Sequence, residues 1–268
     1  MEHIISFPGL GLNFTVNRAV FSIGSFPIYW YGLLIAIGFI LAVVYGAFEC
    51  KKVGISHDDF FNMLLISIPV SVIFARLYYV VFNFGLYKDD LASVINIRNG
   101  GLAVYGGIIG AFIVIFVYCK IKKISLGKIL DILAVGLLIG QAIGRWGNFI
   151  NGEAFGYSTA FPWAMNIKED GVTVASSVHP TFLYESLWNA LGILVLLLLK
   201  KHKKFNGELF CDYLIWYGFG RFFIEGLRTD SLYIASFRVS QILSAILFVV
   251  GIIIIIINRK KCSKNNND

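Results

Sequence analysis

The sequence predicts an all-α membrane protein with about seven transmembrane helices, and two observations carry this prediction. Of 268 residues, 57% are hydrophobic and only 15% are charged, whereas a soluble domain carries about a quarter charged residues. A membrane-spanning helix needs about 20 mostly apolar residues. The sequence offers such windows at about 29–47, 60–84, 102–119, 129–147, 181–199, 209–226 and 238–257.

The apolar windows also exclude a β-barrel, because they are continuously apolar and do not alternate with a period of two. We expect an outer-face N-terminal segment at 1–28, extended or lying at the interface, and a membrane domain at 29–257. A polar and disordered cytoplasmic tail is predicted at 258–268, and the long loop 148–178 is expected to form a small cap on the outer face.

Lysine and arginine positions predict the orientation, since short cytoplasmic loops carry an excess of both. With the N-terminus outside and the C-terminus inside, the inner loops hold fourteen lysines and arginines and the outer segments hold six. The outer six are Arg18, Lys88, Arg98, Lys168, Arg228 and Arg238. The net charge of +7 therefore reads as a topology signal, because the basic residues form small clusters at helix ends, and no nucleic-acid partner is expected.

Three further arginines lie within the apolar segments, all toward the expected outer face. They are Arg76, Arg145 and Arg221. An ionisable group inside a bilayer costs at least about 2.5–3.5 kcal/mol, so such residues usually mark function. Chance alone would gather three arginines on one face about once in four by simple counting, so they need support from other residues.

Other hydrogen-bonding and titratable residues gather at the same face. Tyr217, Arg221 and Glu225 are spaced i, i+4 and i+8 and share one helical face. The others are Tyr31, Tyr105, His179, Tyr184 and Glu185. Because guanidinium groups bind phosphate oxygens in pairs, the sequence predicts a phospholipid head-group site at the outer leaflet.

Glycines four residues apart should let helices approach closely around this site. Gly106 and Gly110 form one such pair, and Gly136, Gly140 and Gly144 form a run at the same spacing. We expect them to hold Arg145 tightly against a neighbouring helix.

Structural roles compete with functional ones at several positions. Arg76 could equally make a structural ion pair, and Arg221 with Glu225 could be a simple self-neutralising pair. His179 precedes a proline and could serve only as a helix cap, while Tyr31 and Tyr217 could belong to an aromatic belt.

Seven motifs spread over nearly the whole chain resemble the bacterial prolipoprotein diacylglyceryl transferases. The most specific is GRWGNFINGEAFG at 144–156. The others are WYG at 30–32, ARLYYVVFN at 75–83, NGGLAVYGGIIG at 99–110, HPTFLYE at 179–185, YGFGRFFIEGLRTD at 217–230 and SQ at 240–241. The resemblance implies a multi-pass protein of the bacterial plasma membrane whose active site faces the outer leaflet.

The resemblance also implies the reaction and its partners. Members transfer the diacylglyceryl group of phosphatidylglycerol to the thiol of a lipobox cysteine in a prolipoprotein signal peptide. A thioether forms, glycerol 1-phosphate leaves, and neither a metal nor an organic cofactor is implied. Arginines that bind the departing phosphate more strongly as its charge develops would lower the barrier.

Position by position, the resemblance implies that Arg145 and Arg221 bind the phosphate and stabilise its departure. The further functional positions implied in this way are Asn148, Glu153, Gly156, Tyr31, Tyr217, Glu225 and His179, and Arg76 is added as a possible lipid contact.

One position departs from the family pattern, at the residue before the Gly106–Gly107 pair. Many members have histidine there, and this chain has Tyr105. Tyrosine, with a pKa near about 10, is a weak base at neutral pH, while a thiol near about 8.5 needs only modest help. Tyr105 could orient the phosphate or the thiol, Glu153 or His179 could accept the proton, or the thiolate could be captured directly.

Two other classes of seven-helix protein fit less well. A transporter could use arginines for an anionic substrate, but its site would be expected near the midplane between paired half-helices. A retinal photoreceptor would need a lysine in the last span, and 238–257 contains none.

Overall fold

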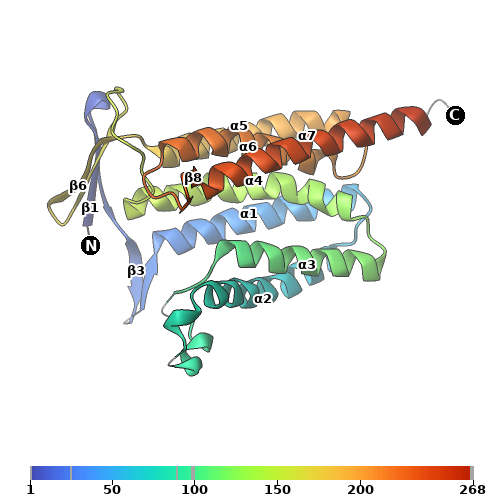
Figure 1. The fold of residues 1–268 in the computed structure, drawn as a ribbon, viewed down its shortest axis with the longest axis horizontal. Helices are drawn as coiled ribbons and strands as arrows, with labels where there is room; N and C mark the ends of the chain where they lie inside the picture. Colours follow the sequence, from blue (N-terminus) through green and yellow to red (C-terminus); the bar gives the residue numbers. More distant parts are fainter. Residues whose placement is uncertain (1, 25, 89, 98–99, 266–268) are drawn as a thin grey trace. The chain divides into compact units, whose positions relative to one another are not determined.

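The computed structural model describes residues 2–24, 26–88, 90–97 and 100–265 (Figure 1). Arg98, which was counted in the orientation, and residues 266–268 of the tail lie outside this part of the chain. The α-helices are α1 (Trp30–Lys52), α2 (His57–Phe82), α3 (Val104–Lys122), α4 (Leu126–Asn151), α5 (Thr181–Leu199), α6 (Glu208–Leu227) and α7 (Val239–Asn265).

The prediction of a largely helical, polytopic membrane protein is confirmed. Within the described residues, six helices have the length and apolar composition to cross a membrane: α1, α2, α3, α4, α5 and α7. The remaining one, α6, carries Glu208, Asp212, Arg221 and Glu225. The number of spans and their orientation therefore remain predictions.

The disordered tail predicted after Ile257 is wrong for the residues that the structure describes. Helix α7 continues through Asn265, and Lys264 lies in its last turn. Lysine and arginine are good helix formers, and cations near a helix C-terminus interact favourably with the helix dipole.

The all-α prediction omits the β-strands, which precede α1 and lie between α4 and α5 and between α6 and α7. They are β1 (Glu2–Phe7), β2 (Leu12–Asn17), β3 (Ala19–Ile23), β4 (Phe26–Tyr29), β5 (Met165–Glu169), β6 (Val172–Val178), β7 (Tyr233–Ile234) and β8 (Phe237–Arg238). Four form one antiparallel sheet in the order β2-β1-β5-β6, while β3–β4 and β7–β8 form separate pairs. Because β1 pairs with β5 across more than 160 residues of chain, as in His3 with Glu169, local sequence does not reveal the sheet.

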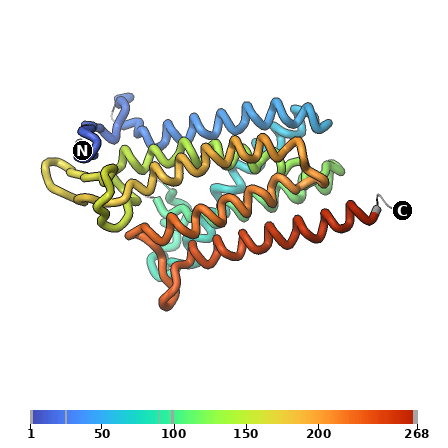
Figure 2. Tube along the Cα trace, turned by 90° about the horizontal axis from the view of Figure 1, so that it is seen from above, coloured from blue at the N-terminus to red at the C-terminus, as the bar shows by residue number. Residues whose placement is uncertain are grey.

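The chain divides into two compact units, residues 1–46 with 130–268 and residues 47–129. In the first unit, the β5–β6 hairpin extends beyond the ends of α4 and α5 (Figures 1 and 2). A core of Ile5, Phe7, Met165 and Ile167 from the sheet packs with Phe149 and Phe182 from those helices. A second core joins α4, α5 and α6 through Val135, Leu138, Leu196, Leu209 and Tyr213.

Glycines bring helices together at some of the predicted positions. In the second unit, a Cβ at Gly106 would collide with the Phe74 carbonyl, and one at Gly110 would lie 2.8 Å from the Phe74 Cβ, so α3 packs directly on α2. In the first unit, a Cβ on Gly38 of α1 would lie 3.3 Å from Gly140 of α4. A Cβ at Gly144 would meet no atom of the described residues within 4 Å, so the expectation of a tight helix contact there is wrong.

Candidate functional site

Glu185 stands at the centre of a cluster of charged side chains in the first unit. Its oxygens lie 2.7 Å from Arg145 Nη2, 2.5 Å from Arg221 Nη1 and 3.3 Å from Arg228 Nη1. Only 4% of Glu185 is exposed. A buried charge is costly unless it is paired, and here one carboxylate is shared by three cations.

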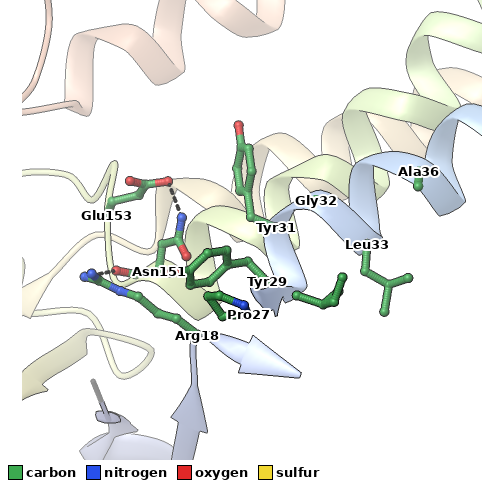
Figure 3. A pocket seen from close by; sticks show the side chains of 10 residues that line it. Arg18, Pro27, Tyr29, Tyr31, Gly32, Leu33, Ala36, Asn151 and Glu153 are labelled. Atoms are coloured by element: carbon green, nitrogen blue, oxygen red, sulfur yellow. Dashed lines mark hydrogen bonds between the residues drawn. The ribbon is translucent and has the colours of Figure 1, made fainter. Parts of the chain in front are cut away.

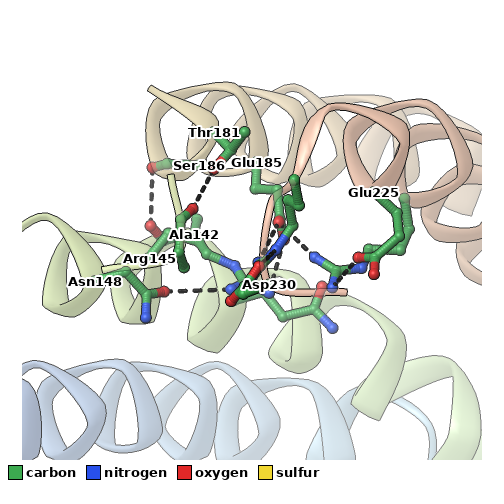
Figure 4. Close-up of polar contacts among 12 residues, drawn as sticks. Ala142, Arg145, Asn148, Thr181, Glu185, Ser186, Glu225 and Asp230 are labelled. Carbon is green, nitrogen blue, oxygen red and sulfur yellow. Dashed lines mark hydrogen bonds and ion pairs between the residues drawn. The ribbon is translucent and has the colours of Figure 1, made fainter. Parts of the chain in front are cut away.

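Two further carboxylates balance these arginines. Arg221 Nη2 lies 2.5 Å from Glu225 Oε2, one turn further along α6. Arg228, just after α6, donates to both oxygens of Asp230, at 2.9 and 2.7 Å. We name these six residues, Arg145, Glu185, Arg221, Glu225, Arg228 and Asp230, the arginine–carboxylate cluster (Figure 4).

Contacts between α4 and α5 fix the direction of Glu185. Ser186, the next residue, donates to the carbonyl of Ala142 at 2.8 Å and accepts from Trp146 Nε1 at 3.1 Å. Thr181 donates to the carbonyl of Ala154 (Figure 4). These bonds hold the first turns of α5 against the end of α4, so Glu185 faces Arg145.

Arg145 is the most accessible of the three arginines and begins a chain of polar contacts. Its side chain is 24% exposed, against 13% for Arg221 and 11% for Arg228. Arg145 Nη1 donates to Asn148 Oδ1 at 3.2 Å, and Asn148 Nδ2 donates to Glu153 Oε1 at 3.0 Å. The cation and the carboxylate of the 144–156 motif are therefore joined through its first asparagine.

Glu153 also lines a pocket of about 790 Å³ in the first unit (Figure 3). Tyr31 of α1, Tyr29 and Arg18 line the same pocket, and its other walls are largely apolar. A Cβ on Gly147 would collide with the Tyr31 ring, so the absence of a side chain there gives Tyr31 its place against α4. The pocket combines a carboxylate, tyrosines and an apolar wall.

Gly156 occupies a backbone junction between the start of α5 and the end of α6. Its N–H donates to the His179 carbonyl at 2.9 Å, and the next N–H, of Tyr157, donates to the Leu227 carbonyl at 2.8 Å. A Cβ on Gly156 would lie 2.8 Å from both His179 Cβ and Leu227 O. This close approach explains why a glycine is needed at 156. The same junction positions Arg228, which pairs with Gly156 as a β-bridge.

His179 and Tyr217 contact different parts of the site. His179 Nδ1 lies 3.1 Å from the Tyr184 hydroxyl, which itself accepts from Trp163 Nε1 at 2.7 Å. Burial lowers the pKa of the His179 imidazole. Tyr217 stacks on Tyr213 and lines a small crevice with Glu185 and Arg221, so it borders the arginine–carboxylate cluster.

Arg76 and Tyr105 belong to the second unit. All the hydrogen bonds found for Arg76 go to backbone carbonyls: Nε to Val94, Nη1 to Gly100 and Gly101, and Nη2 to Ser93, at 2.7–3.0 Å. Four of its five N–H groups are thereby used, which favours the structural role for Arg76. Tyr105 lies in the first turn of α3, is 39% exposed and contacts the Tyr78 ring.

Sequence reasoning missed the residues that hold the cluster together. Glu185 was recognised only as one polar residue of the outer half, and Arg228 was counted as a loop cation. Asp230 was noted only as part of a motif. The signal available for all three was their place inside the HPTFLYE and EGLRTD motifs.

A family model and several known proteins match this chain over most of its length. The sequence model of the family described as prolipoprotein diacylglyceryl transferase matches residues 18–257. A phosphatidylglycerol–prolipoprotein diacylglyceryl transferase of Clostridioides difficile (strain 630) is 47% identical over 251 residues, 94% of this chain and 98% of that protein. The protein of the same name from Bacillus cereus (strain Q1) is 45% identical over 255 residues, 91% of this chain and 93% of its own.

Proposed function

The chain belongs to the prolipoprotein diacylglyceryl transferase family, and we propose that its arginine–carboxylate cluster is the reaction site. The protein is a membrane transferase that moves the diacylglyceryl group of phosphatidylglycerol to prolipoproteins during lipoprotein maturation. The observation that supports the site most strongly is three guanidiniums converging on one buried carboxylate, Glu185.

The bond changes explain why such a site suits the reaction. One glycerol carbon of the diacylglyceryl group carries the phosphate. The sulfur of the lipobox cysteine attacks this carbon. The bond between this carbon and the phosphate oxygen breaks, and its electron pair leaves with glycerol 1-phosphate. The phosphate gains negative charge as it departs, so cations placed beside it stabilise the transition state more than the ground state.

Arg145 is assigned the direct contact with the phosphate, because it is the most exposed arginine of the cluster. Arg221 is held from both sides by Glu185 and Glu225, which presets its position and direction. Removing one preorganised donor to a developing oxyanion costs about 10²–10³ in kcat. Asn148 keeps Arg145 in place, and Tyr217 closes the crevice beside Arg221.

Glu153 is assigned as the acceptor of the proton from the cysteine thiol. This carboxylate is exposed in the pocket beside Tyr31 and connects to Arg145 through Asn148. The His179 ring, by contrast, contacts Tyr184 and Phe161 and not the arginines, among the residues that the structure describes. Gly156 and Glu225 act as positioning residues in this proposal.

Family membership supports the proposal that the protein lies in the bacterial plasma membrane. The lysine and arginine bias supports an orientation with the N-terminus outside, which would place the cluster at the outer leaflet. Phosphatidylglycerol would then enter sideways from the bilayer, and the signal peptide with its lipobox cysteine would approach along the same leaflet. On this proposal residues 1–28 form the outer segment, 29–257 the membrane domain and 258–268 the cytoplasmic tail.

The test uses the protein in nanodiscs with phosphatidylglycerol and a synthetic lipobox peptide. The peptide should gain the mass of a diacylglyceryl group while an equal amount of glycerol phosphate is released, and a peptide with serine in place of cysteine should give neither product. Arg145→Ala and Arg221→Ala should abolish transfer while the protein stays inserted and folded. Full activity in either variant would overturn the assigned role of that arginine.

A further inference from the structure

The C-terminal end of α4 carries the 144–156 motif, and its last carbonyl groups need partners from outside the helix. The following turn supplies two of them. Glu153 N–H donates to the Asn148 carbonyl at 3.1 Å, and Gly152 N–H donates to the Phe149 carbonyl at 3.0 Å. Gly152 has a φ of +64°, the left-handed conformation that commonly ends helices.

The N-terminal segment of the chain supplies the other two partners. His3 Nδ1 lies 3.0 Å from the Ile150 carbonyl, and Arg18 Nη2 donates to the Asn151 carbonyl at 3.3 Å. Cations at the last carbonyls of a helix also interact favourably with its dipole. Strand β1 and the residue after β2 therefore cap α4.

His3 is held on both sides of its ring. Its other ring nitrogen, Nε2, lies 3.2 Å from Glu169 Oε1, and the same oxygen lies 3.1 Å from Arg18 Nη2. His3 is only 1% exposed, so its ring is buried between the end of α4 and strand β5.

The capped turn leads directly into the proposed site. Arg18 donates to the Asn151 carbonyl, and Asn151 Nδ2 in turn donates to Glu153 Oε1 at 3.1 Å (Figure 3). Asn148 donates to the same oxygen and also accepts from Arg145. A change at the cap would therefore move both the carboxylate and the residue that orients the arginine.

We propose that His3, held between the Ile150 carbonyl and Glu169, is a positioning residue that fixes the end of α4 and thereby Glu153 relative to Arg145. The inference rests on the proposed function for its kinetic consequence, but the cap itself can be measured separately. His3 precedes the residues matched by the family's sequence model, which begin at 18. Its charged neighbours include Glu169 on β5 and Arg18 after β2.

Loss of the His3 ring should weaken the cap of α4. The expected signs are faster amide exchange in 152–156 and a lower kcat. Because His3 touches no substrate in this proposal, the KM for phosphatidylglycerol should change little.

The experiment measures transfer kinetics and amide hydrogen exchange for wild type, His3→Ala and His3→Gln. His3→Ala should lower kcat about tenfold or more, since misplacing a reacting group by about 1 Å can cost about 100-fold. The glutamine side chain can still donate to the Ile150 carbonyl, so His3→Gln should keep more of the kcat and of the exchange protection in 152–156 than His3→Ala. His202→Gln is the matched control, because His202 also faces a helix carbonyl, that of Leu198 at 3.2 Å, but is exposed at the end of α5.

Each outcome is decisive. Unchanged kcat and exchange in His3→Ala, or faster exchange with unchanged kcat, would overturn the positioning role. If His3→Ala does not fold, Arg18→Gln removes the neighbouring cap at the Asn151 carbonyl, and unchanged kcat and exchange in that variant would overturn the role of the cap. An active Arg145→Ala would refute the proposed site, whereas an inactive Arg145→Ala beside a fully active His3→Ala would refute only the positioning role.

Discussion

Glu185 Oε2 lies 2.7 Å from Arg145 Nη2, and this ion pair joins the end of α4 to the start of α5. The other oxygen of Glu185, Oε1, forms ion pairs with Arg221 and Arg228. Glu185 thus sets the positions of all three guanidiniums before any substrate binds. This preorganisation is what a site for a departing phosphate requires, because its donors need not be rearranged during the reaction.

Glu185→Gln should impair both stability and transfer. The amide keeps the shape but removes the negative charge, so three arginines are left with two carboxylates. Removing one partner of a buried ion pair costs about 3–5 kcal/mol. Thermal unfolding in detergent and the transfer assay should both show the loss.

Asp230→Asn is the matched control for that variant, because the Asp230 side chain is 48% exposed and pairs only at the edge of the cluster. An exposed ion pair contributes about 0–1 kcal/mol, so its unfolding temperature should change little. Equal losses in the two variants would contradict the central role of Glu185.

The helices could be predicted from sequence because each of them depends on a local apolar run. The window 181–199 matches α5 at both ends, while α7 extends past its predicted end at 257. The arginines were located because a charge inside an apolar run is conspicuous. Glu185 as their shared partner could not be deduced, since it depends on how α4, α5 and α6 pack. The pairing of His3 with Glu169 could not be deduced either, because the two residues are more than 160 positions apart in the sequence.

Arg76→Gln should destabilise the second unit without changing the chemistry. The variant loses most of the donors that hold the carbonyls of Ser93, Val94, Gly100 and Gly101, and a hydrogen bond to a charged group contributes about 1.5–3 kcal/mol. Hydrogen exchange in 93–101 should increase. The KM for phosphatidylglycerol should stay near the wild-type value, and a large rise in that KM would instead support a lipid contact for Arg76.

His179 should make stability depend on pH in a predictable direction. Burial lowers the pKa of its imidazole, so the native state disfavours the charged ring more than the unfolded chain does. The stability linked to His179 is present above the unfolded pKa of about 6.5 and is lost as the pH falls below it. Unfolding temperatures measured on the acid side should fall less in His179→Gln than in wild type. Parallel curves for the two proteins would contradict the prediction.

Glu153→Gln tests the assigned proton acceptor with little disturbance of geometry. The amide oxygen can still accept from Asn148 and Asn151, but the side chain no longer takes a proton. Transfer at neutral pH should fall strongly and recover in part above about pH 8.5, where the peptide thiol ionises by itself. A loss that stays constant across pH would point to a structural role for Glu153.

Tyr105→His should keep transfer activity, because the family has histidine at this position in many members. The side chain is 39% exposed in the first turn of α3, so the smaller ring meets no packing constraint there. Tyr105→Phe removes the hydroxyl and keeps the ring. If Glu153 accepts the proton, this variant should also remain active. Loss in the phenylalanine variant alone would show that the hydroxyl orients the phosphate or the thiol. Loss in both variants would mean that the surroundings of Tyr105 differ from those of the family's histidine, so that neither the ring nor the hydroxyl can be exchanged by itself.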